Sequence, residues 1–576
     1  MLRGGDIVVN ALEDLGVQVV FGVPGEHTDF LYDAIDQAKT VRHVLMRDEA
    51  HCVYAADAYA RASGKMGVCD STVGPGSSKL LSGLAEALNS SVALLALVGG
   101  YDSRDAHYID KGRMSQGVHQ EDYLKPVCKK VFSVHSIMHL YEVLHHAAIC
   151  ACTGTCGPVA VIIPVDILSA IAPDDFHPKM KARPAVFPLF PTVTALSEIK
   201  KAATIIANAQ RPIIIAGGGV LSSGAEKYVS MLADKYQIPV ATTFSGKGSI
   251  SEKHPLSVGF IGNMGIPTAE PLLRSADLVI IAGAKASQNM TYNWTFPSEK
   301  QAVIQLDIDP EEMLLFSCVK CCLVGDCSLT MEILEKELST IKNVDRAEWI
   351  NEVKQAKENW LSLKVAEESA SRALVSPQEV MEILQTHFTS DTCIVADASF
   401  SSSWVAEYIV QSEAGKRCFF PRGLAVLGWA LPAAIGLCET GMFHKVIVVA
   451  GDGAFSYSLC ELATITDHSY PIFSVVLNNS SLGWWRILHT INFDTDTQLE
   501  PTTHLAFDSI GQAFDIPSCS ANENQGLCSN VSKLISLQGP AILNVDTEWH
   551  SSPIWSLREE LGKSLKKKES MDIASF

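Results

Sequence analysis

Short apolar runs of Val, Ile, Leu and Ala alternate along the chain with longer segments that mix apolar and polar residues. The runs at 446–450 and 472–477 flank a segment with helical spacing, Tyr457 to Thr466. A short run that is apolar throughout predicts a strand buried on both faces, and strand, helix, strand in this order predicts a βαβ unit. The repeated pattern therefore predicts an α/β protein built from doubly wound parallel sheets with helices on both faces.

Two stretches of different composition divide this pattern into three parts. The first, 171–191, contains five prolines and predicts an extended linker. The second, 345–371, is charged and favours helix, and the Ser376-Pro377-Gln378-Glu379 segment after it predicts the capped start of a new domain. Since 576 residues are too many for one core, we expect three domains, at 1–170, 190–340 and 372–576.

Composition narrows the functional class. Hydrophobic residues make up 47% and charged residues 19% of the chain, as in a globular protein. A net charge of −19 argues against a nucleic-acid partner, and no uninterrupted apolar run is long enough to predict a membrane span. We expect a cytoplasmic protein whose sixteen cysteines are mostly buried thiols. The Cys318, Cys321, Cys322 and Cys327 group could ligate zinc, but a strand there would scatter these side chains over two faces.

The most informative motif follows the first strand of the βαβ unit: Gly451-Asp452-Gly453-Ala454-Phe455, with Asn478-Asn479 at the end of the next strand. Both strands of such a unit end at one sheet edge, so Asp452 and Asn479 can approach the same ion. Glycines let backbone amides reach a phosphate, and carboxylate and amide oxygens suit Mg²⁺. The motif predicts a magnesium and diphosphate clamp; the alternative is a plain strand-to-helix turn.

The spacing of this motif matches the thiamine diphosphate signature, and further motifs in the same order extend the match over nearly the whole chain. FGVPGEHTDFLYDAI and RDEAHCVYAADAYARASGK lie near the N-terminus, RPIIIAGGGV and IQLDIDPEE in the middle, and GLAVLGWALPAAIG before the glycine motif. Together they resemble the acetolactate synthase and 2-oxo acid decarboxylase superfamily. The resemblance implies a pyrimidine-binding, a central and a diphosphate-binding domain, and an active site shared between two chains of a homodimer or homotetramer.

The resemblance also implies roles for individual residues. Glu49 stands at the position of the glutamate that bonds to the cofactor's pyrimidine ring and promotes removal of the thiazolium proton; the alternative is an ordinary glutamate in the first turn of a helix. The implied metal ligands are Asp452, Asn479 and the Ser481 carbonyl. The implied cofactor contacts are Gly451, Gly453, Ala454 and Phe455 at the diphosphate, the Ala425 carbonyl at the amino group, and Leu427 beneath the bent cofactor.

Two sequence differences from acetolactate synthases weaken the inference that this chain has their activity. The family's Gln-His-Gln run is here Phe400-Ser401-Ser402, whose Ser401 and Ser402 hydroxyls could donate to phosphate instead. An arginine that those enzymes use to hold FAD is here Lys285, which lacks a planar guanidinium. Binding of FAD is therefore possible, but no residue supports it. Binding of an adenine nucleotide or coenzyme A in the central domain has no better support.

Positions that face the substrate decide the reaction. His27 aligns with a histidine of benzaldehyde lyase, Gln116 falls near that enzyme's active-site glutamine, and His119 lies nearby; each could instead be structural. Trp484 and Trp485 follow the asparagine pair, where similar enzymes line the substrate pocket. Decarboxylases carry a proton-donating glutamate at the position of Trp485, so we expect carboligation from a 2-oxo acid such as pyruvate. The alternatives are a non-oxidative decarboxylase, a 2-hydroxy ketone lyase, or a non-catalytic relative that binds thiamine diphosphate.

Overall fold

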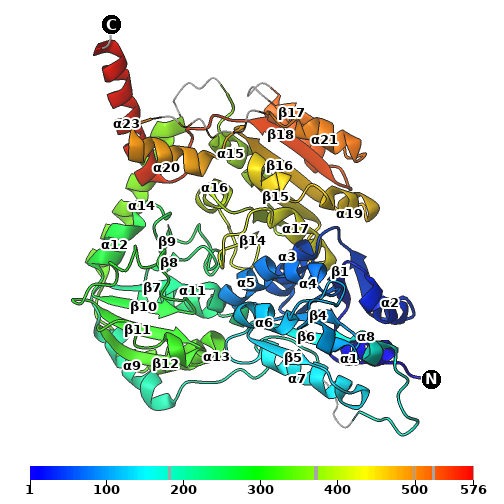
Figure 1. The fold of residues 1–576 in the computed structure, drawn as a ribbon. Coiled ribbons are helices and arrows are strands. Elements are labelled where there is room, and N and C mark those ends of the chain that lie inside the picture. The colour runs from blue at the N-terminus through cyan, green and yellow to red at the C-terminus, as the bar shows by residue number, and fades with distance from the viewer. Residues whose placement is uncertain are drawn as a thin grey trace.

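The computed structural model describes residues 1–178, 183–368, 374–495, 497, 499, 501, 503–521 and 526–574. Within these ranges the strands form three six-stranded sheets in which every paired strand is parallel (Figure 1). This arrangement confirms the predicted fold class. The sheets follow one another along the chain, at 19–164, 212–324 and 392–546.

The N-terminal sheet is covered on both faces. Along β4, Leu94 and Ala96 enter one core while Leu95 and Leu97 enter another, because successive side chains of a strand point to opposite faces. The sheet has the order β2 (Arg42–Leu45), β1 (Val19–Gly22), β3 (Gly67–Ser71), β4 (Leu94–Gly100), β6 (Pro158–Pro164), β5 (Lys130–Ser133). Its helices are α1 (Gly4–Asp14), α2 (Asp29–Asp36), α3 (Glu49–Ser63), α4 (Pro75–Lys79), α5 (Leu81–Asn89), α6 (Gln120–Leu124), α7 (Leu140–Cys152) and α8 (Val165–Ser169).

The central sheet has the order β12 (Val319–Val324), β11 (Ala302–Asp307), β10 (Leu278–Ala282), β7 (Pro212–Ala216), β8 (Val240–Thr242), β9 (Ser257–Phe260). Its helices are α9 (Leu196–Asn208), α10 (Gly218–Ser223), α11 (Glu226–Tyr236), α12 (Ala269–Ser275), α13 (Cys327–Leu338) and α14 (Ala347–Glu368). Cys321 is buried in its core, whereas its neighbour Cys322 on β12 is half-buried, so the two thiols occupy different faces.

The C-terminal sheet has the order β14 (Cys418–Phe419), β13 (Thr392–Ala396), β15 (Lys445–Gly451), β16 (Ile472–Asn478), β18 (Ala541–Asp546), β17 (Ser518–Ala521). Its helices are α15 (Pro377–His387), α16 (Phe400–Tyr408), α17 (Ala430–Glu439), α18 (Asp452–Ser456), α19 (Glu461–Asp467), α20 (Gly483–Phe493), α21 (Phe507–Ala513), α22 (Leu527–Ile535) and α23 (Trp555–Ala574).

The crossover between β15 and β16 differs from the prediction of one helix from Tyr457 to Thr466. The chain enters a helix at once at Asp452, leaves it after Ser456 and re-enters it at Glu461. The Ser456 hydroxyl donates to the Gly453 carbonyl at 2.6 Å and so competes with continuation of the helix. The early start places Asp452 directly at a helix N-terminus.

The N- and C-terminal domains of one chain share a core. One face of the C-terminal sheet, including Val446 and Val448, packs into the same cluster as α3 of the N-terminal domain, and α17 lies between them against α3 (Figure 1). The indole of fully buried Trp429 donates to the Asp57 carboxylate at 3.2 Å across this contact. Among the described residues, no helix is long and apolar enough to cross a membrane.

Candidate functional site

The structure brings the residues of the predicted clamp to one sheet edge. β15 ends at Gly451, which lies opposite Leu477 of β16, so Asp452 and the Asn478-Asn479 pair leave neighbouring strands side by side. Burial raises the pKa of the Asp452 carboxyl to about 6, although nearby backbone amides of Gly453, Ser481 and Ser480 oppose the rise. A desolvated carboxylate of this kind gains from a bound cation.

The two asparagines have different surroundings. Asn478 is buried, and its amide nitrogen donates to Asn544 Oδ1 at 3.0 Å and to the Leu505 carbonyl at 2.9 Å. Asn479 Oδ1 accepts from the Ser481 amide at 3.1 Å, which fixes the turn that carries Ser481. The Ser481 hydroxyl oxygen is buried without a hydrogen-bond partner. Asn478 thus supports the sheet, while Asn479 and Ser481 form the turn that follows the strand.

The glycines of the clamp border open space. A Cβ added at Gly453 would meet nothing closer than Leu482 Cδ2 at 3.8 Å, and one at Gly451 nothing closer than Ser401 Oγ at 3.9 Å. Side chains here would occupy the place of a ligand, so these residues fit a bound diphosphate. Ala454 and Phe455, which follow in α18, are buried.

The two serines that replace the family's Gln-His-Gln run do not share one role. Ser401 is the residue whose hydroxyl lies beside Gly451. Ser402 is fully buried, and its hydroxyl donates to the Asp397 carbonyl at 2.6 Å. Ser401 is therefore the serine whose hydroxyl lies near the proposed diphosphate position. Ser402 instead helps to pack α16.

Two buried carboxylates hold the loop 423–428, which contains Ala425 and Leu427. Glu86 of α5 accepts from the amides of Gly423, Leu424 and Ala425 at 2.8, 2.6 and 3.1 Å. At the other end of the loop, Asp397 accepts from the amides of Gly428 and Ala430. Burial raises the pKa of Asp397 to about 6.

This clamping of the loop leaves Ala425 and Leu427 exposed in the single chain. Sequence reasoning missed both carboxylates. For Glu86 a signal existed, since a lone acid lies among apolar residues in the segment LSGLAEALN.

Glu49 is the first residue of α3, and Asp48 caps this helix by accepting from the Ala50 amide at 2.9 Å. The Glu49 side chain is 12% exposed and its Oε2 lies 3.3 Å from Lys79 Nζ. A Cβ at Gly76 would come within 3.1 Å of Glu49 Oε1, so the glycine lets the chain pass close to this carboxylate. These neighbours all belong to the N-terminal domain.

His27 and Gln116 meet through a residue that the sequence did not single out. The Tyr101 ring lies edge-on to His27, with centroids 6.0 Å apart, and its hydroxyl donates to the Gln116 carbonyl at 2.6 Å. His27 Nδ1 is buried without a hydrogen-bond partner. The Gln116 backbone passes over Gly74, next to the turn that approaches Glu49, and lines an open pocket there. Because Nδ1 is closed off from solvent, the predicted contact of His27 with a substrate oxygen would have to come from its other ring nitrogen, Nε2.

The other predicted pocket residues lie apart from this group. His119 is exposed and forms an ion pair with Asp110 at 2.9 Å on the surface. Trp484 packs its ring against Phe400, with centroids 5.0 Å apart, and joins the core. Trp485, one residue later on α20, is exposed and lies against His489. Adjacent residues on a helix point in different directions, so Trp485 remains the better candidate for a substrate wall.

Some backbone near these groups has a strained conformation. Gln116, Ser399, Ala425 and Ser480 all have positive φ, between 50° and 69°, although none is glycine. Such conformations cost about 1–3 kcal/mol each and persist where surrounding contacts enforce them, often at functional sites. Nine other non-glycine residues among those described also have positive φ, so this strain accompanies the candidate site but does not locate it.

A buried ion pair ties the segment around Glu49 to the C-terminal domain. Glu461 of α19 accepts from His51 Nδ1 at 2.8 Å and from the Arg47 amide at 3.0 Å. Burial alone would lower the pKa of His51, but the contacts with Cys460 and Glu461 outweigh it and raise the pKa to about 9. Residues on either side of Glu49 are therefore held by one carboxylate.

We expect His51→Gln to destabilise the protein in a pH-dependent manner. Folding raises the pKa of His51, so its stabilisation is fully present below pH 6.5 and is lost as the pH rises through 9. The loss should be about 2 kcal/mol at pH 6 and should shrink toward zero above pH 9. Thermal melts of both proteins at pH 6, 7.5 and 9.5 measure it; a pH-independent difference would contradict the role of the charge.

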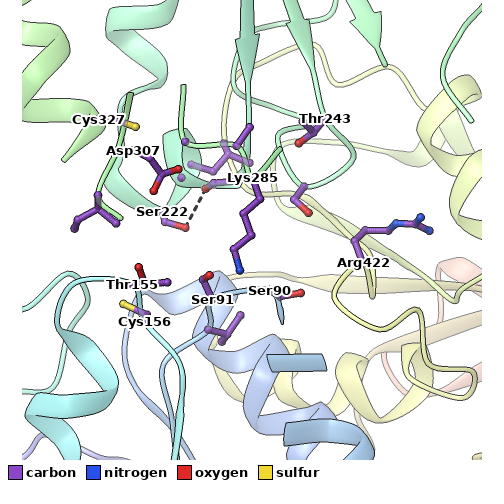
Figure 2. A pocket seen from close by; sticks show the side chains of 18 of the residues that line it. Ser90, Ser91, Thr155, Cys156, Ser222, Thr243, Lys285, Asp307, Cys327 and Arg422 are labelled. Atoms are coloured by element: carbon purple, nitrogen blue, oxygen red, sulfur yellow. Dashed lines mark hydrogen bonds between the residues drawn. The ribbon is translucent and has the colours of Figure 1, made fainter. Parts of the chain in front are cut away.

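A cavity of about 500 Å³ lies between the three domains (Figure 2). Figure 2 shows Lys285 reaching from the central domain across this space toward Ser90 and Ser91, where its Nζ donates to the Asn89 carbonyl at 2.9 Å. Asp307 lies at another side of the cavity, and burial together with Glu312 and Asp309 raises its pKa to about 6.

The lining of this cavity adds no support for a bound flavin. Lys285 crosses the cavity and donates to the Asn89 carbonyl. The glycine turn beside the cavity is required by packing instead, because a Cβ at Gly217 would meet the Gly283 carbonyl oxygen at 2.2 Å and one at Gly219 would meet Gly283 Cα at 2.7 Å. FAD was left open by the sequence, and no step of the reaction proposed below depends on it.

Each of the three sheets overlaps a region that matches a known protein-family domain. The N-terminal TPP-binding domain of thiamine pyrophosphate enzymes matches residues 2–125, the central domain 199–334, and the C-terminal TPP-binding domain 397–545. The clamp residues lie in the third match and Glu49 lies in the first. Thiamine diphosphate is thus the cofactor that both site-bearing domains are built to bind.

Curated relatives cover most of the chain. A probable acetolactate synthase large subunit of Methanococcus aeolicus is 32% identical over 84% of this chain and 81% of its own length. The acetolactate synthase large subunit of Corynebacterium glutamicum is 30% identical, over 86% and 77%. Acetolactate synthase 2, chloroplastic, of Zea mays is 27% identical, over 94% and 85%.

Proposed function

This chain belongs to the thiamine pyrophosphate enzymes related to acetolactate synthase large subunits, and we propose that it joins two carbonyl compounds, with pyruvate as the donor. The observation that carries the proposal is the joint presence of a desolvated Asp452 beside open glycines and of Glu49 at the start of α3. A protein that kept the fold without chemistry would have no need of both. The relatives named above support the reaction class.

The chain supplies binding and positioning, while bound thiamine diphosphate supplies a nucleophilic carbon and takes up electrons. Asp452, Asn479 and the Ser481 carbonyl would hold Mg²⁺, and the amides of Gly453 to Phe455 would hold the diphosphate. Ser401 lies where its hydroxyl can donate to a phosphate oxygen. Glu49 would share a proton with the pyrimidine ring nitrogen and so set the protonation of the ring.

The exposed residues of the site would contact the reactive part of the cofactor and the substrate. Leu427 would support the cofactor from below, and the Ala425 carbonyl, in its strained loop, would accept from the ring's amino group. His27 and Gln116 would bind substrate oxygens. The Trp485 side chain has no acidic proton to donate to a bound substrate, so a second carbonyl compound would have time to react before protonation. This favours ligation, with decarboxylation and 2-hydroxy ketone cleavage as the alternatives.

We propose that two copies of the chain build each site. Leu424, Leu427, Tyr457, Leu482 and Trp485 leave an apolar surface exposed beside the clamp of one chain. Such a surface at the site of a diphosphate ligand favours cover by another protein surface. The neighbours of Glu49 in its own chain are N-terminal residues, so a second copy's Glu49 would complete the site. A homodimer is the smallest active form, and a tetramer would pair two such dimers.

Mixing two inactive variants tests this arrangement. In a heterodimer of Glu49→Gln and Asp452→Asn chains, one shared site carries both substitutions and the other carries neither. Random exchange of subunits should therefore restore about a quarter of the wild-type sites. No recovery after proven exchange would mean that each chain builds its own site.

Product analysis by NMR tests the reaction itself. We expect the protein with thiamine diphosphate and Mg²⁺ to convert pyruvate to acetolactate, or to a 2-hydroxy ketone when an aldehyde is added. Free acetaldehyde as the sole product would favour the decarboxylase instead. Cofactor binding without turnover over a wide panel of donors would establish a non-catalytic relative.

We expect Trp485→Glu to raise the share of free aldehyde among the products several-fold, because a carboxyl group there can protonate the intermediate before a second carbonyl arrives. NMR of the product mixture measures the ratio. Trp485→Phe serves as the matched control and should keep the wild-type ratio. An unchanged ratio in Trp485→Glu would remove Trp485 from the substrate wall.

A cytoplasmic location remains part of the proposal. All sixteen cysteines are free thiols in the structure, as suits a reducing compartment. The relative from Zea mays is named chloroplastic, so imaging of the full chain fused to a fluorescent protein should separate the two compartments.

A further inference from the structure

Next to the segment that carries Glu49 lies a group of three side chains that the proposed reaction does not use. His51 Nδ1, Cys460 Sγ and a Glu461 carboxylate oxygen all lie within 4.8 Å of one another. The sulfur is 3.7 Å from His51 Nδ1 and 4.0 Å from Glu461 Oε1. Cys460 is exposed, whereas His51 and Glu461 are buried.

We propose that Cys460 is a reactive thiol, activated by His51, that hydroperoxides oxidise to a sulfenic acid. A carboxylate can only accept, so His51 Nδ1 carries a proton and points it toward Glu461 and the sulfur. An imidazolium held beside an exposed thiol by a buried carboxylate is the environment of reactive cysteines. The proposal stands on this geometry and is independent of the reaction with pyruvate.

The other cysteines of the chain differ from Cys460 in access or in surroundings. Fourteen of the sixteen are buried or half-buried. Burial raises the pKa of many of them, as for Cys156 to about 11 and Cys418 to about 12. The remaining exposed thiol is Cys528 in α22, and no histidine contact is recorded for it among the described residues. Cys528 is therefore a matched internal control.

The oxidation balances with a hydroperoxide as the oxidant. The thiol proton passes to solvent, because His51 is already protonated, and the thiolate beside the imidazolium attacks the outer peroxide oxygen. The O–O bond breaks as the S–O bond forms, so the sulfur loses two electrons and the peroxide gains them. The leaving alkoxide, or hydroxide when the oxidant is hydrogen peroxide, takes up a proton from solvent, which gives a sulfenic acid and an alcohol or water.

Oxidation of Cys460 should disturb the segment that carries Glu49. Glu461 holds both His51 and the Arg47 amide, two residues to either side of Glu49, and the Thr464 hydroxyl of the same helix donates to the Leu45 carbonyl at 3.0 Å. A sulfenic acid at Cys460 adds a polar oxygen beside this network and competes for its hydrogen bonds. The expected loss of turnover rests on the proposed role of Glu49, whereas the oxidation does not.

Trapping with dimedone tests the proposal on the full-length holoenzyme. After treatment with hydrogen peroxide, mass spectrometry should find the dimedone adduct on Cys460 about tenfold faster than on Cys528. His51→Gln should bring Cys460 down to the rate of Cys528. Cys460→Ser should keep its turnover and resist inactivation by peroxide, whereas Cys528→Ser should remain as sensitive as the wild type.

Several results would overturn the proposal. Equal rates at Cys460 and Cys528 in the wild type would do so without any variant, even if His51→Gln fails to fold. One zinc per chain in the purified protein, lost in Cys460→Ser, would show that the three side chains ligate a metal instead. Fast oxidation of Cys460 with no loss of turnover would refute the link to the Glu49 segment.

Discussion

Glu49→Gln is expected to lower turnover of pyruvate by at least about a hundredfold while the protein still folds and binds thiamine diphosphate. Glutamine keeps the size of the side chain but cannot share a proton with the pyrimidine ring. The side chain is mostly buried and its neighbours are Lys79 and the backbone at Gly76, so the substitution disturbs little packing. Initial rates and cofactor titration by fluorescence quenching give the two readouts.

The chain offers a matched control for this prediction. Glu226 is likewise the first residue of a helix, α11, but belongs to the central domain. Glu226→Gln should keep wild-type turnover. Full activity in Glu49→Gln would show that Glu49 only stabilises the start of α3, which is the role that any glutamate in a first helical turn can play.

Asp452→Asn is expected to weaken binding of thiamine diphosphate in the presence of Mg²⁺ by at least about a hundredfold. The substitution removes the one carboxylate that the clamp offers a cation, while the shape of the turn is kept. Since burial raises the pKa of Asp452 to about 6, the wild-type protein should also bind more weakly as the pH falls below 6, because a proton then competes with the metal. Isothermal titration calorimetry from pH 5 to 7.5 measures both effects.

Asp29→Asn is the control, because Asp29 is also the first residue of a helix, α2, and is exposed. It should bind the cofactor as the wild type does. Equal affinity of Asp452→Asn with and without Mg²⁺, at the wild-type value, would remove Asp452 from the metal site. A wild-type affinity independent of pH below 6 would show that the carboxylate does not meet the cation.

Local features of the fold were predictable because they depend on neighbours in sequence. The apolar runs at 446–450 and 472–477 predicted buried parallel strands, and β15 and β16 contain them. The glycine motif and the second asparagine were predicted to meet at one edge, since the strands that precede them had to be parallel neighbours. The exact course of the crossover was not predictable, because it depends on local hydrogen bonds such as that from the Ser456 hydroxyl to the Gly453 carbonyl, which competes with continuation of the helix.

The arrangement of residues around the clamp depends on contacts between residues far apart in the chain, which no local sequence pattern reveals. Glu86 meets Leu424 at a separation of 338 residues, and His51 meets Glu461 at 410. Trp484 and Trp485 looked equivalent in the sequence, yet one packs on Phe400 and the other is exposed. Which of these side chains is buried is determined when the domains pack, because burial of a polar group is favourable only where it finds a hydrogen-bond partner.

The sequence by itself determined the fold class, the family resemblance, and the positions of Glu49, Asp452 and Asn479, since these follow from periodicity and from motif spacing. Only the tertiary structure decided how these parts are held. Buried carboxylates at 86, 397 and 461 each fix a segment distant in the chain, and the strained backbone at Ala425 persists because Glu86 bonds to its amide. Desolvation makes each of these bonds strong, and desolvation exists only once the domains have packed.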